Sequence, residues 1–177
     1  MLTFKYVILM TLMLDSNYTI VNFTKNTMLY DWVTVTDVVM GGQSTSTISI
    51  NAAGNALFKG SISLENNGGF SLLRHRFQKL DISQFNNIKL RLKGDGKMYQ
   101  FRIKPSRFHQ YAYIYNFKTN GEWQTIELNL TDFQPAFRGR NLDMPNFSGN
   151  ELEEIGFLIG NKLSENFELV INSIVLE

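Results

Sequence analysis

Short stretches in which apolar and polar residues alternate dominate this chain from Thr19 onward. Gly, Asn or Asp bounds most of these stretches, and turn signals recur along the chain at residues 66–69, 94–96 and 120–121. Alternation with a period of two places successive side chains on opposite faces of a strand. No stretch keeps apolar residues at helical spacing for three turns. The pattern therefore predicts an all-β fold, an antiparallel β-sandwich with jelly-roll topology.

The alternation also predicts where the clearest strands lie and which stretch is irregular. The longest stretch without alternation is 131–150, which contains two prolines, and loops of that length are usually functional or packed. The predicted strands are 55–64, 87–93, 97–104, 108–117, 123–130, 154–160 and 167–176.

The chain has 177 residues, close to the length of one domain of about 150 residues. We assign residues 19–177 to a single β-sandwich domain and residues 1–18 to a separate N-terminal segment. The apolar run at 6–14 is shorter than the 20 or so residues that cross a bilayer, but it fits an export signal. It has one positive charge and no small-residue cleavage site. An export or tethering segment and a start without such a role both stay open, so location is cytoplasmic or exported.

Composition excludes several classes of function. The chain is 44% hydrophobic and 19% charged, which excludes a disordered or coiled-coil protein. It has no cysteine, which excludes a disulfide scaffold, a zinc finger and a thiol nucleophile. Its two histidines do not begin a metal-binding spacing, and no phosphate-binding loop or serine-nucleophile motif is present. We therefore expect no catalytic residues, no metal and no cofactor.

The net charge of +1 hides two blocks of opposite sign. Residues 74–107 contain ten basic and two acidic residues, whereas 151–177 contain six glutamates and one lysine. The basic block indicates either a ligand-facing strip or basic strands that lie beside acidic ones. With so small a total charge, we expect no nucleic-acid partner, and no segment is long enough to form a stable transmembrane span.

The predicted strand faces raise a question about the aromatic residues. Arg102 falls on the polar face of its strand, and Trp123 falls on the polar face of another. If a row of aromatic residues shared one face with them, the sheet would present a surface suited to sugars. The alternative is that the row packs in the core. The row consists of Tyr111, Tyr113, Tyr115 and Phe117.

Two glycine-containing motifs are the densest local signals in the chain. Paired glycines allow positive φ or a close backbone approach, and neighbouring Asp or Asn side chains can bond to the exposed amides. The motifs are thus either turns that the backbone requires or loops that contact a partner. The first comprises Trp32, Asp37, Met40, Gly41, Gly42 and Ser44, and the second comprises Asn66, Asn67, Gly68, Gly69 and Phe70.

Together the two motifs resemble the complex I intermediate-associated protein family, the thirty-kilodalton type. The likeness continues through residues 94–101, Trp123, the Arg138-Gly139-Arg140 loop and the C-terminal strand, and it covers about 19–177. Asn161 and Asn172 depart from the acidic residues of the family pattern, which argues against an ion site at the C-terminal acids. The resemblance implies a galactose-binding-like jelly roll and a stand-alone, bacterial-type member of a family of assembly chaperones.

Two functions follow from these observations. The first is a non-catalytic assembly factor whose protein partner contacts one of three loops: 40–42, 66–70 or 138–140. The second is a carbohydrate-binding module that uses Trp123, the tyrosine row and either Arg91 or Arg102.

Overall fold

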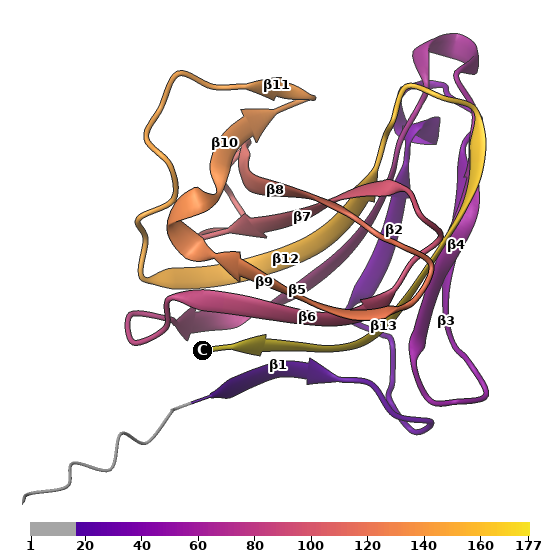
Figure 1. The fold of residues 1–177 in the computed structure, drawn as a ribbon. Helices are drawn as coiled ribbons and strands as arrows, with labels where there is room; N and C mark the ends of the chain where they lie inside the picture. The colour runs from indigo at the N-terminus through magenta and orange to yellow at the C-terminus, as the bar shows by residue number, and fades with distance from the viewer. Residues whose placement is uncertain (1–16) are drawn as a thin grey trace, which may run out of the picture.

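Two antiparallel sheets, stacked face to face, contain all the strands of the computed structural model, which describes residues 17–177 (Figure 1). One sheet has six strands in the order β3-β4-β13-β6-β9, and β1 pairs with the second half of β13. The other has seven strands in the order β11-β10-β8-β7-β12-β5-β2. The predicted antiparallel sandwich is confirmed. The predicted N-terminal segment lies almost wholly outside the described residues.

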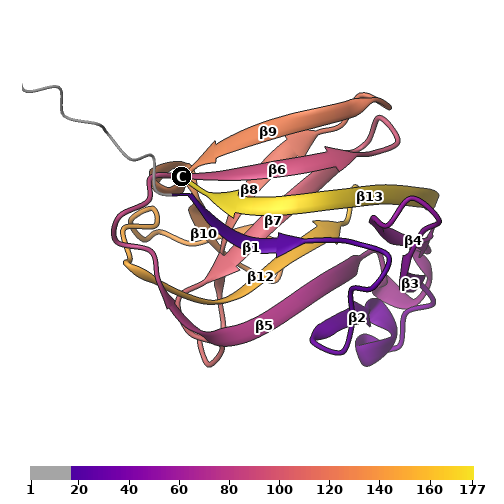
Figure 2. The same cartoon turned by 90° about the horizontal axis from the view of Figure 1, so that it is seen from below.

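The strand β13 organises the six-stranded sheet because it is long enough to serve two neighbours along one edge. Its first half pairs with β4, and its second half pairs with β1, which Figure 2 shows running beside it. The six strands are β1 (Tyr18–Asn22), β3 (Thr45–Ile50), β4 (Ala56–Ile62), β6 (Asn87–Lys93), β9 (Trp123–Asn129) and β13 (Glu165–Leu176).

Three one-turn 3-10 helices interrupt the connections, and within residues 17–177 no helix is long and apolar enough to cross a membrane. These helices are η1 (Asp37–Met40), η2 (Glu65–Asn67) and η3 (Leu130–Asp132). The strands of the second sheet are β2 (Trp32–Thr36), β5 (Ser71–Asp81), β7 (Met98–Lys104), β8 (Ala112–Lys118), β10 (Gln134–Phe137), β11 (Arg140–Asn141) and β12 (Glu151–Ile159).

The core forms from the apolar residues that alternate along each strand. In β6 the three apolar residues that alternate along the strand, Ile88, Leu90 and Leu92, are fully buried. From the opposite sheet, Phe101 of β7 packs edge-on against Phe157 of β12, with ring centroids 5.0 Å apart. Period-two patterning therefore predicted the inward faces of these strands correctly, because a packed sheet buries one face of each strand.

The tyrosine row faces the core. Tyr113 and Tyr115 of β8 pack against the core cluster, and Phe117 is buried within it. Tyr111 precedes β8 and stacks on the His109 ring. Of the two arrangements that the sequence left open, the structure therefore shows packing in the core for Tyr113, Tyr115 and Phe117, and Trp123 and Arg102 belong to different sheets.

Several predicted boundaries differ from the structure, most of all at 108–117 and in the stretch 131–150. The predicted strand 108–117 begins too early, since β8 starts at Ala112 and Phe108 lies 85% exposed in the preceding turn. Pro105 lacks the amide donor that a strand ladder needs, so the chain leaves β7 there. The stretch 131–150 is packed: it contains η3, β10 and β11 and buries Phe133 and Phe147. Its two prolines obscured the short strands.

Phe101 and Phe108 both fall in predicted strands, but the structure buries Phe101 and exposes Phe108. Replacing each of them by alanine tests this difference. Phe101→Ala should lower the free energy of unfolding by about 3–5 kcal/mol because a fully buried ring is replaced by a cavity. Phe108→Ala should change it by less than about 0.5 kcal/mol. Urea unfolding followed by tryptophan fluorescence measures both. Equal losses in the two variants would contradict the assigned boundary of β8.

Candidate functional site

A buried carboxylate holds together the loops that contain both glycine motifs. Asp37, at the start of η1, is fully buried. Its carboxylate accepts hydrogen bonds from the amide and the hydroxyl of Ser44, and from the amides of Gly69 (2.5 Å) and Phe70 (3.3 Å). One side chain therefore ties η1 both to the start of β3 and to the turn that precedes β5.

The hydrogen bonds keep this carboxylate ionised. Burial by itself raises the pKa of Asp37, but the Ser44 hydroxyl and the amides of Gly69, Ser44 and Phe70 stabilise the charged form more strongly. The net result is a pKa below the ordinary value for aspartate. The fold therefore contains a buried negative charge that protein donors surround, and the charge is satisfied before any ligand is considered.

Glycine is required at the positions around Asp37 for two different physical reasons. A β-carbon on Gly42 would lie 2.4 Å from the Asp37 carboxylate, and one on Gly68 would lie 2.6 Å from it, so both positions need empty space. Gly41 instead has open space around it and ends η1 with φ near +91°, a left-handed conformation that L side chains disfavour. The motif therefore builds a turn, as one of the two interpretations predicted.

A second carboxylate plays the same part elsewhere. Asp95, in the turn between β6 and β7, accepts hydrogen bonds from the Lys97 ammonium (2.7 Å), the Tyr99 hydroxyl (2.9 Å) and the Glu168 amide (3.0 Å). The bond from Glu168 connects the turn to β13, the neighbour of β6 in the six-stranded sheet. Within residues 94–101, which carry part of the family resemblance, Asp95, Lys97 and Tyr99 thus have a structural role.

An apolar tip projects from the loops that Asp37 organises. Val38, Val39 and Met40 of η1 are 58%, 71% and 59% exposed. Leu64 before η2 and Leu163 between β12 and β13 are also exposed, and these three loops lie together at the upper right of Figure 1. Sequence reasoning selected Met40 and missed the other four, although their signal was visible as apolar residues inside loop segments.

Hydrogen bonds join the loops that form the apolar tip, which we define as Val38, Val39, Met40, Leu64 and Leu163. The Asn66 side chain donates to the Gly41 carbonyl (3.1 Å), and the Leu64 amide donates to the Ser164 hydroxyl (3.3 Å). Asn66 and Asn67 reach this arrangement with positive φ values of 54° and 59°. The tip is therefore an exposed apolar surface on hydrogen-bonded loops.

The other selected residues lie apart from the tip. Trp32 is buried and stacks on the His75 ring with centroids 4.5 Å apart, so its role is in the core. Arg138 and Gly139 form the tight turn between β10 and β11, both with positive φ, and Arg138 lies over the Phe137 ring. Arg140 is exposed at the start of β11.

Trp123 forms a separate small platform at the edge of the six-stranded sheet. Its side chain is 39% exposed on the edge strand β9, and the Arg91 guanidinium of β6 lies 5.4 Å from its ring centroid. Arg102 lies on the outer face of the other sheet. The structure therefore supports Arg91, and not Arg102, as the cationic neighbour of Trp123.

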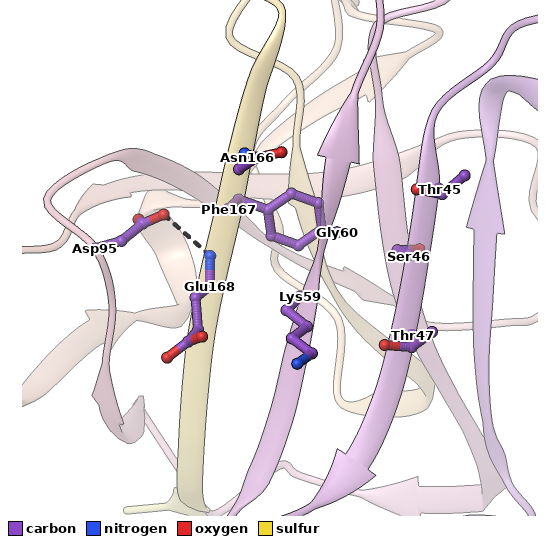
Figure 3. Close-up of a pocket in the computed structure, with 9 residues that line it drawn as sticks. All are labelled: Thr45, Ser46, Thr47, Lys59, Gly60, Asp95, Asn166, Phe167 and Glu168. Atoms are coloured by element: carbon purple, nitrogen blue, oxygen red, sulfur yellow. Dashed lines mark hydrogen bonds between the residues drawn. The ribbon is translucent and has the colours of Figure 1, made fainter.

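A groove of about 520 Å³ lies on the six-stranded sheet (Figure 3). Lys59 and Glu168 lie opposite each other on the adjacent strands β4 and β13, and Thr47 follows on β3. Sequence reasoning missed this groove, because its residues come from three strands and the turn between β6 and β7, which only strand pairing brings together. Within residues 17–177, no group of three or more His, Asp or Glu side chains could hold a metal ion.

The family model of complex I intermediate-associated protein 30 matches residues 21–171. The chain belongs to this family. Among its relatives, the mitochondrial complex I intermediate-associated protein 30 of Drosophila melanogaster is 24% identical over 88% of the chain, and that of Mus musculus is 23% identical over 86%. The chain spans only 61% and 53% of the length of these two relatives.

Solved structures with the same fold include carbohydrate-binding modules. A family 11 module from Clostridium thermocellum, in complex with a β-1,3-1,4-mixed-linked tetrasaccharide, superposes with a TM-score of 0.67 at 17% identity and covers 90% of this chain and 94% of the module. A family 29 module has a TM-score of 0.53 at 10% identity, over 92% and 91% of the two chains. These likenesses show the jelly-roll fold alone.

Replacing the buried carboxylate by an amide tests its role. Asp37→Asn should lower the free energy of unfolding at pH 7 by about 2–3 kcal/mol, because an amide cannot accept from all the donors that the carboxylate satisfies. The pKa of Asp37 is lower in the folded protein than in the unfolded chain. The extra stability of the wild type is therefore fully present above about pH 4, the ordinary pKa range of aspartate, and is lost as the pH falls through the pKa of Asp37 in the folded protein.

Urea unfolding of both proteins at pH 7 and pH 3 measures this change, with the exposed Asp143→Asn as the matched control. The control should unfold like the wild type at both pH values. Equal stability of Asp37→Asn and wild type at pH 7 would show that the carboxylate does not hold the loops.

Proposed function

We propose that this protein is a non-catalytic interaction module of the assembly-factor type, and that its apolar tip contacts a protein partner. The observation that carries the proposal is the exposure of Val38, Val39 and Met40 next to one another on one turn. Apolar side chains gathered on a surface are typical of interaction sites, because a partner that covers them removes apolar surface from water, which is favourable.

The base of the tip supports this proposal. The Asp37 carboxylate and the bond from Asn66 to Gly41 fix the turn that carries the three side chains. A surface held in its binding conformation loses little conformational entropy on association. The glycines and Asp37 would then act indirectly: they shape the tip, and the side chains of Val38, Val39 and Met40 within the first motif make the contacts.

Family membership supports the kind of partner. The matched relatives are named for their association with intermediates of complex I, and we propose that the partner of this chain is a subunit or intermediate of a respiratory complex of that kind. Binding without turnover also agrees with the site, since the carboxylate at its base, Asp37, already accepts hydrogen bonds from Ser44, Gly69 and Phe70.

The double variant Val39→Asp/Met40→Asp tests the proposal. Native affinity purification from the host, with quantitative mass spectrometry, should recover complex I subunits with the wild type and at least about tenfold less with the variant, because two charges would have to be buried at the contact. Thermal unfolding should match the wild type, since both side chains are exposed.

Phe108→Asp provides the control, because it adds a charge at another exposed apolar residue. Phe108 follows β7, whose last residue, Lys104, lies opposite Glu154 near the end of β12 that is distant from the tip. Its recovery of complex I subunits should equal that of the wild type. Wild-type recovery by the tip variant would refute the role of the tip, and failure of the wild type to recover any complex I subunit would refute the choice of partner.

A carbohydrate-binding role is the second candidate, and the Trp123 platform is the observation that favours it. An exposed Trp face beside an Arg side chain is suited to stacking on a sugar ring. On this candidate, titration calorimetry with a mixed-linked β-glucan tetrasaccharide should show binding that Trp123→Ala weakens about tenfold or more. Absence of heat with the wild type would remove this candidate.

A further inference from the structure

The outer face of the seven-stranded sheet carries a cluster of positive charge that neither proposed function uses. Register places the cluster in two rows across β5, β12 and β7. The first row is Arg76, Glu154 and Lys104, and the second is Arg74, Gly156 and Arg102. Their neighbours Leu73, Ile155 and Ile103 are buried in the core, so the two rows share the outer face. We name these four cations with Glu154 the basic cluster.

The basic cluster has too few negative charges for its cations. Four cations face one carboxylate, which leaves a net charge of +3. Glu154 binds Arg76 closely, with Nε and Oε2 2.7 Å apart, but its distance to Arg74 Nε is 3.9 Å, beyond a hydrogen bond. Within residues 17–177, Lys104 forms no ion pair, and the buried Nε of Arg74 has no hydrogen-bond partner.

Burial makes this imbalance costly. It lowers the pKa of Arg102 and, together with the neighbouring arginines, that of Lys104, while Glu154 opposes both shifts. Arg102 donates to Gln100 on its own strand (3.0 Å), a neutral acceptor. Partly buried guanidinium groups normally donate hydrogen bonds to carboxylates or other oxyanions. The guanidinium donors on this face are therefore suited to bind a negatively charged acceptor.

The spacing of the two arginines favours a compact ligand. Gly156 carries no side chain between Arg74 and Arg102, but it is buried, because the Leu72 side chain lies 3.1 Å from where its β-carbon would be, so the two arginine side chains are the polar groups available at this row. Neighbouring strands are about 4.8 Å apart, which puts the backbones of these arginines about 10 Å from each other. Two oxyanion groups of one small molecule can span that width, with one at each guanidinium.

We propose that the basic cluster is a binding site for a ligand that carries two or more oxyanion groups, such as carboxylates. The ligand lies across the outer face of β12 and is bound between the side chains of Arg74 and Arg102, with Lys104 at its edge. The same chemistry can come from a small polycarboxylate or from an acidic peptide segment. The site is independent of the apolar tip and of the Trp123 platform.

Citrate is the first probe, titrated by calorimetry at constant ionic strength. The wild type should bind it, and Arg102→Gln and Lys104→Gln should each weaken binding by about tenfold or more, because each removes charge-assisted hydrogen bonds. Arg91→Gln, on the outer face of the other sheet, is the matched control and should bind like the wild type. Circular dichroism verifies that each variant is folded, and Lys104→Gln keeps the test valid if Arg102→Gln is unstable.

A hexaglutamate peptide, titrated in the same way, distinguishes the two sources. Tighter binding of the peptide than of citrate, with the same loss in Lys104→Gln, supports the site and identifies an acidic segment as its ligand. Stronger binding of citrate supports the site with a small polycarboxylate. Absence of wild-type binding to both probes, or an equal loss in Arg91→Gln and Lys104→Gln, overturns the proposal, since only general charge attraction would then remain.

Discussion

The hydrogen bonds to the Asp37 carboxylate determine the structure of one end of the sandwich. A carboxylate without partners would be too costly to bury, so its place in the fold requires donors close on several sides. Ser44 supplies two, and the turn at Gly69, 32 residues away in sequence, supplies more. The glycines around it leave space for the carboxylate. The exposed apolar tip follows from the same constraint, because the residues that continue from Asp37 are turned outward.

The distribution of charge combines both arrangements that the sequence allowed. Acidic strands do lie beside basic ones: Lys79 pairs with Glu151, and Lys89 pairs with Glu177. These pairs neutralise part of the basic block, as expected when strands of opposite charge are neighbours in a sheet. The exception is the region around Glu154, where β12 supplies one carboxylate and then a glycine between two basic strands. The local excess of positive charge arises from that register alone.

The positions of the aromatic residues show what the alternation of side chains along a strand, its parity, can and cannot predict. Parity within β8 correctly put Tyr113 and Tyr115 on one face, and parity within β9 put Trp123 on the polar side. It could not tell which face of β8 pointed to the core, because both faces carry apolar residues: Ile114 and Ala112 are buried on the outer side against Ala136. Nor could it assign β8 and β9 to different sheets. Both facts depend on long-range pairing.

The sequence by itself determined the all-β class, the turns, the family and the inward faces of the clearest strands, since these depend on local alternation and on glycine geometry. The tertiary structure decided which residues meet. Asp37 and Gly69, Arg74 and Arg102, and the three loops of the apolar tip are distant in sequence and become neighbours only through strand order and register. A strand pattern has the same period whichever partner it pairs with, so it contains no information about that choice.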